Sequence, residues 1–193
     1  RTLAAERGMT LAPSYDDFDI IEGQGTLALE AACQAAELGA AFDVFITCCG
    51  GGGMTAGCAT ILEEVSPATQ IAIAEPEGFD ETWASIRDGV LRKADISRRT
   101  LCDALASPAP GELTLPIMAR RVSAGASITD DEVQAAVAYA FKYLKLVVEP
   151  GGAVALAAVL TGKIPAAGRT IGLTLSGGNI DPSLYAQILS DFA

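Results

Sequence analysis

The sequence predicts an α/β fold in which a mostly parallel sheet is flanked by helices on both faces. Segments with the character of strands and of helices alternate along the 193 residues. The strand-like segments are continuously apolar and do not alternate with polar residues, which is typical of parallel strands covered on both faces. With 50% hydrophobic and 19% charged residues, the chain can bury a core of the size that one domain needs.

Three segments are predicted to be strands, at residues 42–49 (FDVFITCC), 69–76 (TQIAIAEP) and 169–178 (RTIGLTLSGG). The first is a short apolar run with β-branched residues that ends in front of four glycines. A helix-like segment separates it from the second strand. This order of strand, helix and strand is the unit from which parallel sheets are built.

Four segments are predicted to be the covering helices, at residues 25–40, 54–65, 129–144 and 150–160. Thr26 is a candidate N-cap of the first helix, and Gly39 marks its end. Thr129 and Glu132 form the pattern of a capping box at the start of the third, and the fourth starts with a proline, as first helical turns often do. Residues 89–121 lack a clear periodicity and are expected to cross the surface.

The composition disfavours several classes of function. With 24 acidic against 13 basic residues the net charge is -11, which argues against binding to nucleic acid or to an anionic membrane surface. The apolar runs are far shorter than the roughly 20 residues that span a bilayer, and no signal peptide is visible. The absence of histidine removes catalytic triads and metal sites based on imidazole. The five cysteines lack CxxC spacing, so a cytoplasmic location is expected.

Four consecutive glycines, Gly50 to Gly53, lie between the first predicted strand and the next helix. At such a junction the N–H groups and the helix dipole favour an anion, and bare backbone lets several N–H groups converge on it, so a phosphate is the expected ligand. A tight or flexible turn is the structural alternative. No lysine follows the glycines, which disfavours a Walker-type site, whereas a dinucleotide fingerprint with Glu75 as the ribose partner remains open.

Two further residues are expected near this loop. Ser176 ends the third predicted strand in the run SGGN, so its hydroxyl is expected at the same carboxyl edge of the sheet as the glycines, where open α/β sheets bind ligands. A plain turn residue is the alternative. Glu149 precedes the helix at 150–160 and could approach the ligand or cap that helix, and capping is the expected role.

The motifs IIEGQGTLALE, GGGGMTAG, AEPEGFDE, VEPGGAVALAAVL and LSGGNID follow one another along the chain. In order and spacing they resemble the serine/threonine dehydratase and serine racemase group of fold-type II pyridoxal-phosphate enzymes, over residues 1–181. The resemblance is to the C-terminal portion of such an enzyme and implies a tryptophan synthase β-like fold. It also implies that residues 1–12 are a remnant of a small domain and that residues 13–193 are the C-terminal part of the large, cofactor-binding domain.

The resemblance implies which residues bind the cofactor, pyridoxal 5'-phosphate. Its phosphate is expected on Gly50, Gly51, Gly52 and Gly53, with the N–H of Met54 as a fifth donor. Ser176 corresponds to the serine at the pyridine nitrogen. A neutral hydroxyl there makes the ring a weaker electron sink than a carboxylate does, which favours loss of a β-hydroxyl over transamination.

A cation site is implied in the AEPEGFDE motif. In the group that the chain resembles, a carboxylate after the strand, a backbone carbonyl and a second acidic residue bind the cation, and these positions are Glu75, Phe79 and Glu81 here. Such oxygen ligands suit Mg²⁺ or Ca²⁺. Related enzymes often have aspartate at the third position. Solvated surface carboxylates are the alternative.

The implied reaction is β-elimination of water from a hydroxy amino acid such as serine, threonine or a 3-hydroxyaspartate, which gives a 2-oxo acid and ammonia. The Schiff-base lysine is expected upstream of this chain, because none of its lysines lies in a Ser-x-Lys-x-Arg type motif, and the chain alone is expected to be inactive. The implied partners are the amino-acid substrate, the missing N-terminal segment and a second copy in a homodimer. Ala104 stands where related enzymes frequently have glycine, which leaves the substrate open. The alternatives are an amino-acid racemase, a dinucleotide-binding domain and a non-catalytic structural fragment.

Overall fold

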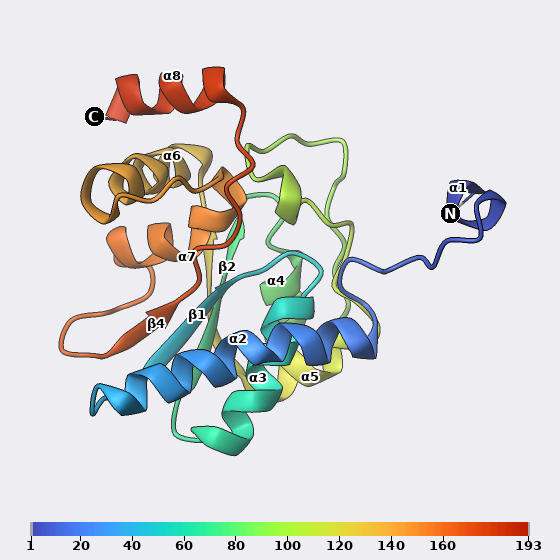
Figure 1. Cartoon of the computed structure of the whole chain (residues 1–193), viewed down its shortest axis with the longest axis horizontal. Coiled ribbons are helices and arrows are strands. Elements are labelled where there is room, and N and C mark those ends of the chain that lie inside the picture. The colour runs from blue at the N-terminus through green and yellow to red at the C-terminus, as the bar shows by residue number, and fades with distance from the viewer. Residues whose placement is uncertain (1, 193) are drawn as a thin grey trace.

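The computed structural model describes residues 2–192 and contains one sheet of four parallel strands in the order β3-β2-β1-β4 (Figure 1). The strands are β1 (Val44–Cys48), β2 (Gln70–Pro76), β3 (Val122–Ile128) and β4 (Ile171–Leu173). β1 and β2 pair in continuous register, from Val44 with Gln70 to Cys48 with Ala74. The predicted parallel sheet is confirmed.

Helices cover both faces of this sheet (Figure 1). One face carries α2 (Phe18–Glu37), α3 (Gly53–Val65), α4 (Glu81–Asp88) and α5 (Thr114–Arg121). The other carries α6 (Asp130–Tyr139), its π-helical extension η2 (Ala140–Leu144), α7 (Pro150–Leu160) and α8 (Pro182–Phe192). A 3-10 turn, η1 (Asp103–Leu105), lies in the loop before α5, and α1 (Thr2–Glu6) stands apart from the α/β body in Figure 1. None of the helices described is long and apolar enough to cross a membrane.

Each face of β1 packs into a separate hydrophobic core. Val44, Ile46 and Cys48 belong to the core under α6 and α7, whereas Phe45 belongs to the core under α2 and α3. The whole strand is buried. Because both faces of the strand need apolar side chains, its sequence shows no polar alternation, and this is the pattern that predicts the architecture.

Helix α2 begins earlier than the predicted residue 25. The carboxylate of Asp17 accepts a hydrogen bond from the N–H of Asp19 and caps the helix there. The prediction that Thr26 is the N-cap is therefore wrong. The Thr26 hydroxyl instead donates to the carbonyl of Gly23 inside the helix.

The other predicted helix ends are confirmed. Gly39 follows the end of α2 with a φ of +70°, the left-handed conformation in which many helices stop. At the start of α6, the Thr129 hydroxyl accepts from the N–H of Glu132 at 3.3 Å. The Glu132 carboxylate accepts from the N–H of Thr129 at 2.8 Å, which completes the capping box.

The sequence pattern does not predict β3, α4, α5 or α8. β3 has the sequence VSAGASI, whose small and polar residues resemble a loop, and it lies at an edge of the sheet. α5 lies inside the range 89–121, so the expectation that this range only crosses the surface is wrong at its end. β4 is shorter than the predicted 169–178, because its pairing with β1 ends at Leu173.

Parallel pairing brings the carboxyl ends of three strands to one edge of the sheet. β1 leads into the glycine loop, Glu75 lies near the end of β2, and Ser176 follows β4. The fold therefore gathers at one edge the three segments from which the sequence predicts a site.

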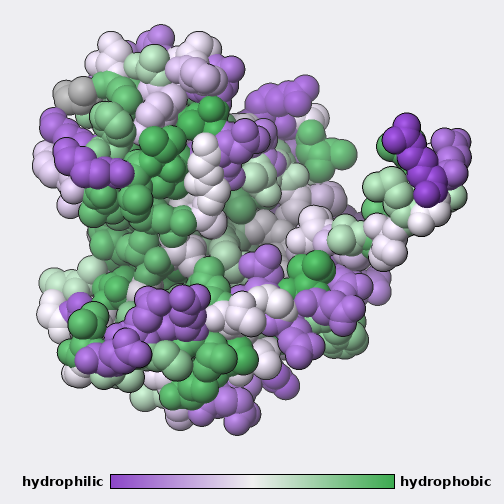
Figure 2. All heavy atoms as spheres, viewed as in Figure 1, coloured by the Kyte–Doolittle hydropathy of each residue, from purple (hydrophilic) through white to green (hydrophobic). Residues whose placement is uncertain are grey.

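The β4 side of the molecule is apolar and open. Figure 2 shows hydrophobic atoms gathered there, between the layer of α6 and α7 and the layer of α2. In η2 and the segment after it, Phe141, Tyr143 and Val147 are 44%, 61% and 54% exposed. Among the described strands β4 pairs with β1 alone, so its outer edge offers unpaired N–H and C=O groups.

Candidate functional site

The loop from Gly50 to Gly53 joins the end of β1 to the start of α3. Gly52 is the N-cap of α3 and has a φ of +94°, which glycine adopts without steric cost. A Cβ atom at Gly51 would collide with the ring of Tyr15, and one at Gly52 would collide with the Met118 side chain. The fold itself therefore requires glycine at Gly51 and Gly52, so the tight-turn alternative accounts for part of the four-glycine run.

The N–H groups of this loop are available to a ligand. Within residues 2–192 the structure contains no hydrogen-bond acceptor for the N–H groups of Gly50, Gly51, Gly52, Gly53 and Met54. The N–H of Thr55 also lacks an acceptor there, whereas the N–H of Cys49 donates to Ala74 and that of Ala56 donates to the carbonyl of Gly52. A run of unpaired N–H groups at the positive end of a helix is suited to an anion such as phosphate.

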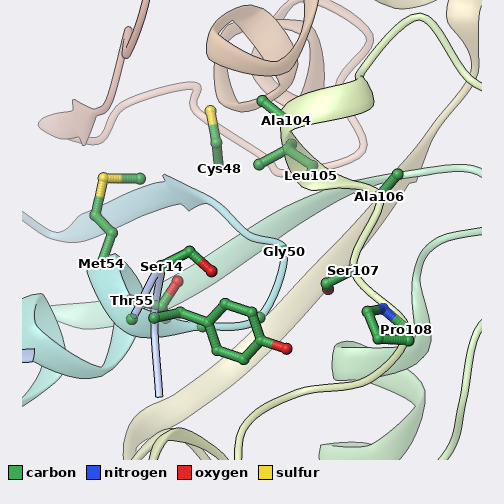
Figure 3. Close-up of a pocket in the computed structure, with 14 residues that line it drawn as sticks. Ser14, Cys48, Gly50, Met54, Thr55, Ala104, Leu105, Ala106, Ser107 and Pro108 are labelled. Atoms are coloured by element: carbon green, nitrogen blue, oxygen red, sulfur yellow. The ribbon is translucent and has the colours of Figure 1, made fainter. Parts of the chain in front are cut away.

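A cavity of about 370 Å³ opens at this loop (Figure 3). It is lined by residues 14–15, 48, 50–55 and 104–108. Figure 3 shows Cys48 and Leu105 on one side of the cavity, with Ser14 and Thr55 across from them. The Tyr15 hydroxyl donates to the carbonyl of Ala109 at 3.4 Å, directly after the last lining segment. The predicted phosphate loop is thus one wall of a cavity built from distant parts of the chain.

Ser176 lies at the same edge of the sheet but is not among the residues that line this cavity. Its N–H donates to the carbonyl of Gly152 at 3.4 Å, and its side chain lies beside the thiol of Cys48, which does line the cavity. Burial raises the pKa of the Cys48 thiol, so Cys48 packs as a neutral group. Ser176 is therefore one side chain away from the cavity that the glycine loop lines.

Glu149 is the N-cap residue of α7, as expected, but it caps through its backbone carbonyl, which accepts from the N–H of Gly152, and not through its side chain. Its side chain bonds to no N–H of that helix, and its carboxylate accepts a hydrogen bond from the N–H of Asn179 at 2.9 Å. Its own N–H donates to the carbonyl of Gly177 at 3.2 Å. Glu149 thus ties the turn after Ser176 to the start of α7.

Glu75 and Glu81 are buried close to each other, at 1% and 5% exposure, so the alternative of solvated surface carboxylates is wrong. The Glu75 carboxylate accepts from the N–H groups of Thr82 at 3.1 Å and Trp83 at 2.7 Å, and it thereby holds the first turn of α4. Glu75 is buried and does not line the cavity at the glycine loop, so it cannot reach a ribose bound there, and the dinucleotide alternative loses its acidic partner.

Burial raises the pKa of Glu75 well above its usual range, and the negative charge of Glu81 raises it further. Burial also raises the pKa of Glu81, whose Oε1 accepts from the Ser107 hydroxyl at 3.3 Å. Its Oε2 is buried without a hydrogen-bond partner among the described residues. Phe79, whose carbonyl is the remaining predicted ligand, is buried in the segment between β2 and α4. Residues 2–192 contain no group of three or more acidic, cysteine or histidine side chains placed to hold a metal ion, so these two carboxylates stand as a pair.

The family model described as "Pyridoxal-phosphate dependent enzyme" matches residues 1–177. The chain belongs to this family. It is 34% identical over 189 residues to the L-threo-3-hydroxyaspartate ammonia-lyase of Pseudomonas sp., which covers 98% of this chain and 58% of that protein. It is 31% identical over 193 residues to the serine racemase of Dictyostelium discoideum, with the same coverages of 98% and 58%.

The crystal structure of the T.th. threonine deaminase superposes with a TM-score of 0.88 at 36% identity, and covers 94% of this chain and 64% of that chain. The resemblance and the fold class that the sequence predicts are therefore confirmed. The chain spans a little more than half the length of the curated relatives it matches.

The lysines of this pyridoxal-phosphate enzyme chain lie away from the cavity. None of the described lysines lines it, and all are exposed: Lys93, Lys142, Lys145 and Lys163. The ammonium group of Lys163 is paired with the Glu132 carboxylate at 2.6 Å. That the lysine carrying the cofactor lies outside this chain stays a prediction.

Sequence reasoning missed three residues that shape the site, namely Tyr15, Thr82 and Thr114. Tyr15 packs against the glycine loop from a segment that precedes α2, where an aromatic residue between polar neighbours is only a weak indication of function. Thr82 and Thr114 lie in the first turns of α4 and α5, where threonine is common for helix capping alone.

Proposed function

We propose that this chain forms the phosphate-binding half of the active site of a pyridoxal-phosphate-dependent ammonia-lyase. The reaction would eliminate water from a hydroxy amino acid and release a 2-oxo acid and ammonia. The observation that carries the proposal is the run of N–H groups from Gly50 to Met54, which have no acceptor among residues 2–192 and line a cavity at the start of α3.

The residues present fit the cofactor. Gly50, Gly51, Gly52, Gly53 and Met54 would donate their N–H groups to its phosphate, and the positive end of α3 would offset the phosphate charge. The Ser176 hydroxyl, on the turn held by Glu149, would meet its pyridine nitrogen. When bound, pyridoxal phosphate withdraws electrons from the α-carbon of the substrate and so acidifies the proton there. Because the Ser176 side chain is neutral, it would not keep the pyridine nitrogen protonated. The cofactor ring would then withdraw electrons only weakly, which favours loss of the β-hydroxyl.

We infer the substrate class from the relatives. Hydroxyaspartate, threonine and serine appear in the names of proteins that are 31% to 36% identical to this chain. The cavity wall supplied here, Ala104 to Ser107, is neutral. Racemisation is a second candidate, because a serine racemase is among the relatives that cover 98% of the chain.

We also infer that the lysine that carries the cofactor lies in a part of the enzyme other than residues 1–193, and that residues 1–12 belong to its small domain. A segment outside these residues would cover the open β4 edge. Assembly into a homodimer and a cytoplasmic location stay predictions.

The function is tested with the purified full-length enzyme, loaded with cofactor and incubated with serine, threonine or L-threo-3-hydroxyaspartate. We expect ammonia and a 2-oxo acid in equal amounts from at least one of them. Chiral analysis of the remaining amino acid measures racemisation. Borohydride reduction followed by peptide mass analysis locates the lysine. Absence of ammonia with all three substrates, or a label on Lys142 or Lys163, would contradict the proposal.

We propose further that Glu75, Glu81 and the carbonyl of Phe79 bind Mg²⁺ or Ca²⁺. The supporting observations are the burial of two like charges side by side and the unpartnered Oε2 of Glu81, since a cation would satisfy both. Its binding would hold the first turn of α4 in place through Glu75.

Addition of Ca²⁺ or Mg²⁺ after chelation is expected to raise the melting temperature of the wild-type protein by several degrees. A free cation concentration of about 100 times the dissociation constant adds about 2.7 kcal/mol to the free energy of unfolding. Glu81→Gln should abolish the shift, whereas Glu77→Gln, at an exposed carboxylate nearby, should leave it unchanged. Differential scanning fluorimetry measures this. Equal melting temperatures with cation and with chelator would contradict the cation site.

A further inference from the structure

Two backbone carbonyls of the glycine loop are held by threonine hydroxyls whose residues do not line the cavity. The carbonyl of Gly50 accepts from the Thr82 hydroxyl at 3.0 Å. The carbonyl of Gly51 accepts from the Thr114 hydroxyl at 2.7 Å and from the N–H of Gly111 at 3.1 Å. Both threonines are completely buried, at 0% exposure, so these bonds are shielded from water.

These bonds set the direction of the neighbouring N–H groups. A trans peptide is planar, and its C=O and N–H point in opposite directions. Fixing the carbonyl of Gly50 therefore fixes the N–H of Gly51, and fixing the carbonyl of Gly51 fixes the N–H of Gly52. These are two of the N–H groups that lack an acceptor among residues 2–192.

The orientation needs such support because glycine peptides rotate easily. A flipped peptide would present its carbonyl oxygen to an anion and repel it. The next peptide is held by α3 itself, since the carbonyl of Gly52 accepts from the N–H of Ala56 at 2.8 Å. The first two peptides lie outside the helix. The first is held by Thr82, and the second by Thr114 together with the N–H of Gly111.

Each threonine is itself fixed by its surroundings. The N–H of Thr82 donates to the buried carboxylate of Glu75, which places its hydroxyl at the start of α4. The Thr114 hydroxyl also accepts from the N–H of Gly111 at 3.0 Å. Its nearer acceptor is the carbonyl of Gly51 at 2.7 Å, compared with 3.5 Å to the carbonyl of Gly111. Helices α4 and α5 thereby act as supports for the loop.

We propose that Thr82 and Thr114 are positioning residues that keep the N–H groups of Gly51 and Gly52 directed at an anionic phosphate ester. This inference rests on the proposed function of the glycine loop. It assigns these threonines a role in phosphate affinity, which buried packing residues would not have.

The test measures the affinity of the full-length apo-protein for pyridoxal phosphate and for pyridoxal, which lacks the phosphate. Thr82→Val and Thr114→Val keep the side-chain shape and remove the hydroxyl. Each is expected to weaken pyridoxal phosphate binding about tenfold while the affinity for pyridoxal stays within about twofold of wild type. Thr82→Ser and Thr114→Ser keep the hydroxyl and should restore the wild-type affinity.

Thr69→Val is the matched control. Thr69 is also buried, at 3% exposure, and its hydroxyl donates to the carbonyl of Phe42 at 2.9 Å. It lies directly before β2, at the end of the strand that is far from Glu75 and the glycine loop. The variant should lose stability without losing phosphate affinity. Thr82→Ala and Thr114→Ala, which add no methyl group beside the loop, provide the same measurement if the valine variants do not fold.

The outcomes separate the two claims. If the wild-type protein binds pyridoxal phosphate no better than pyridoxal, both the phosphate loop and the role of the threonines are overturned. If the wild-type protein prefers pyridoxal phosphate and the hydroxyl-free variants keep the full preference, only the role of the threonines is overturned.

Discussion

Gly152→Ala is expected to lower the free energy of unfolding by about 3 kcal/mol, because its methyl group would collide with the backbone carbonyl of Ser176. Neither backbone can yield easily. Gly152 lies in the first turn of α7, and its own carbonyl accepts the N–H of Ser176. The turn that carries Ser176 would have to move away from the cavity, so affinity for the cofactor should fall together with stability. Urea unfolding measures the first effect and cofactor titration the second.

The adjacent glycine offers a matched control in the same helical turn. A Cβ atom at Gly151 would lie 3.4 Å from Cγ of Leu105, which is an ordinary contact. Gly151→Ala is therefore expected to change the free energy of unfolding by less than about 0.5 kcal/mol. Equal destabilisation by the two alanines would show that the contact with Ser176 has no special cost.

Ser176→Asp is expected to slow the elimination of water by about tenfold or more while the protein stays folded. A carboxylate in contact with the pyridine nitrogen would raise the pKa of that nitrogen, and each unit corresponds to a tenfold change in the protonation equilibrium. The stronger electron withdrawal that results should divert the reaction from prompt loss of the hydroxyl. Steady-state assay of the 2-oxo acid gives the rate, and a pH titration of the cofactor absorbance gives the pKa.

Ser176→Thr keeps a neutral hydroxyl and should retain most of the activity, so it controls for the change in side-chain size. The Asp variant also places a second carboxylate near Glu149, which ties down the same turn. Adding Glu149→Gln to the Ser176→Asp variant tests whether repulsion between the two carboxylates contributes to the lower rate. A wild-type rate in Ser176→Asp would mean that this residue does not contact the cofactor ring.

The glycine loop could be predicted from the sequence because everything that defines it is contiguous. An apolar strand, four glycines and a helical pattern follow one another between residues 42 and 65, and their chemistry does not depend on distant residues. The same holds for the capping box at Thr129 and Glu132. At these two places the sequence pattern correctly predicts the local backbone structure.

The supports of the loop could not be predicted, because they join residues far apart in the chain. The bond from Thr82 to Gly50 spans 32 positions, and the bond from Thr114 to Gly51 spans 63. The side-chain partner of Glu149 could not be predicted for the same reason: local rules favour a side-chain cap at a helix start, whereas its carboxylate bonds to Asn179, 30 positions away. Strand β3 could not be predicted for a related reason. Its small residues do not look like a strand in the sequence, and at Gly125 the small residue makes room for the distant Trp83 side chain.

The central claim is that the loop from Gly50 to Gly53 holds the phosphate of pyridoxal phosphate, and a crystal structure of the cofactor-bound full-length enzyme tests it most directly. We predict phosphate oxygens within about 3 Å of the N–H groups of this loop and of Met54, with the carbonyls of Gly50 and Gly51 still bonded to the buried threonines. The Ser176 hydroxyl should lie at the pyridine nitrogen. A phosphate bound elsewhere in the cavity, with these N–H groups paired to protein or solvent, would contradict the account.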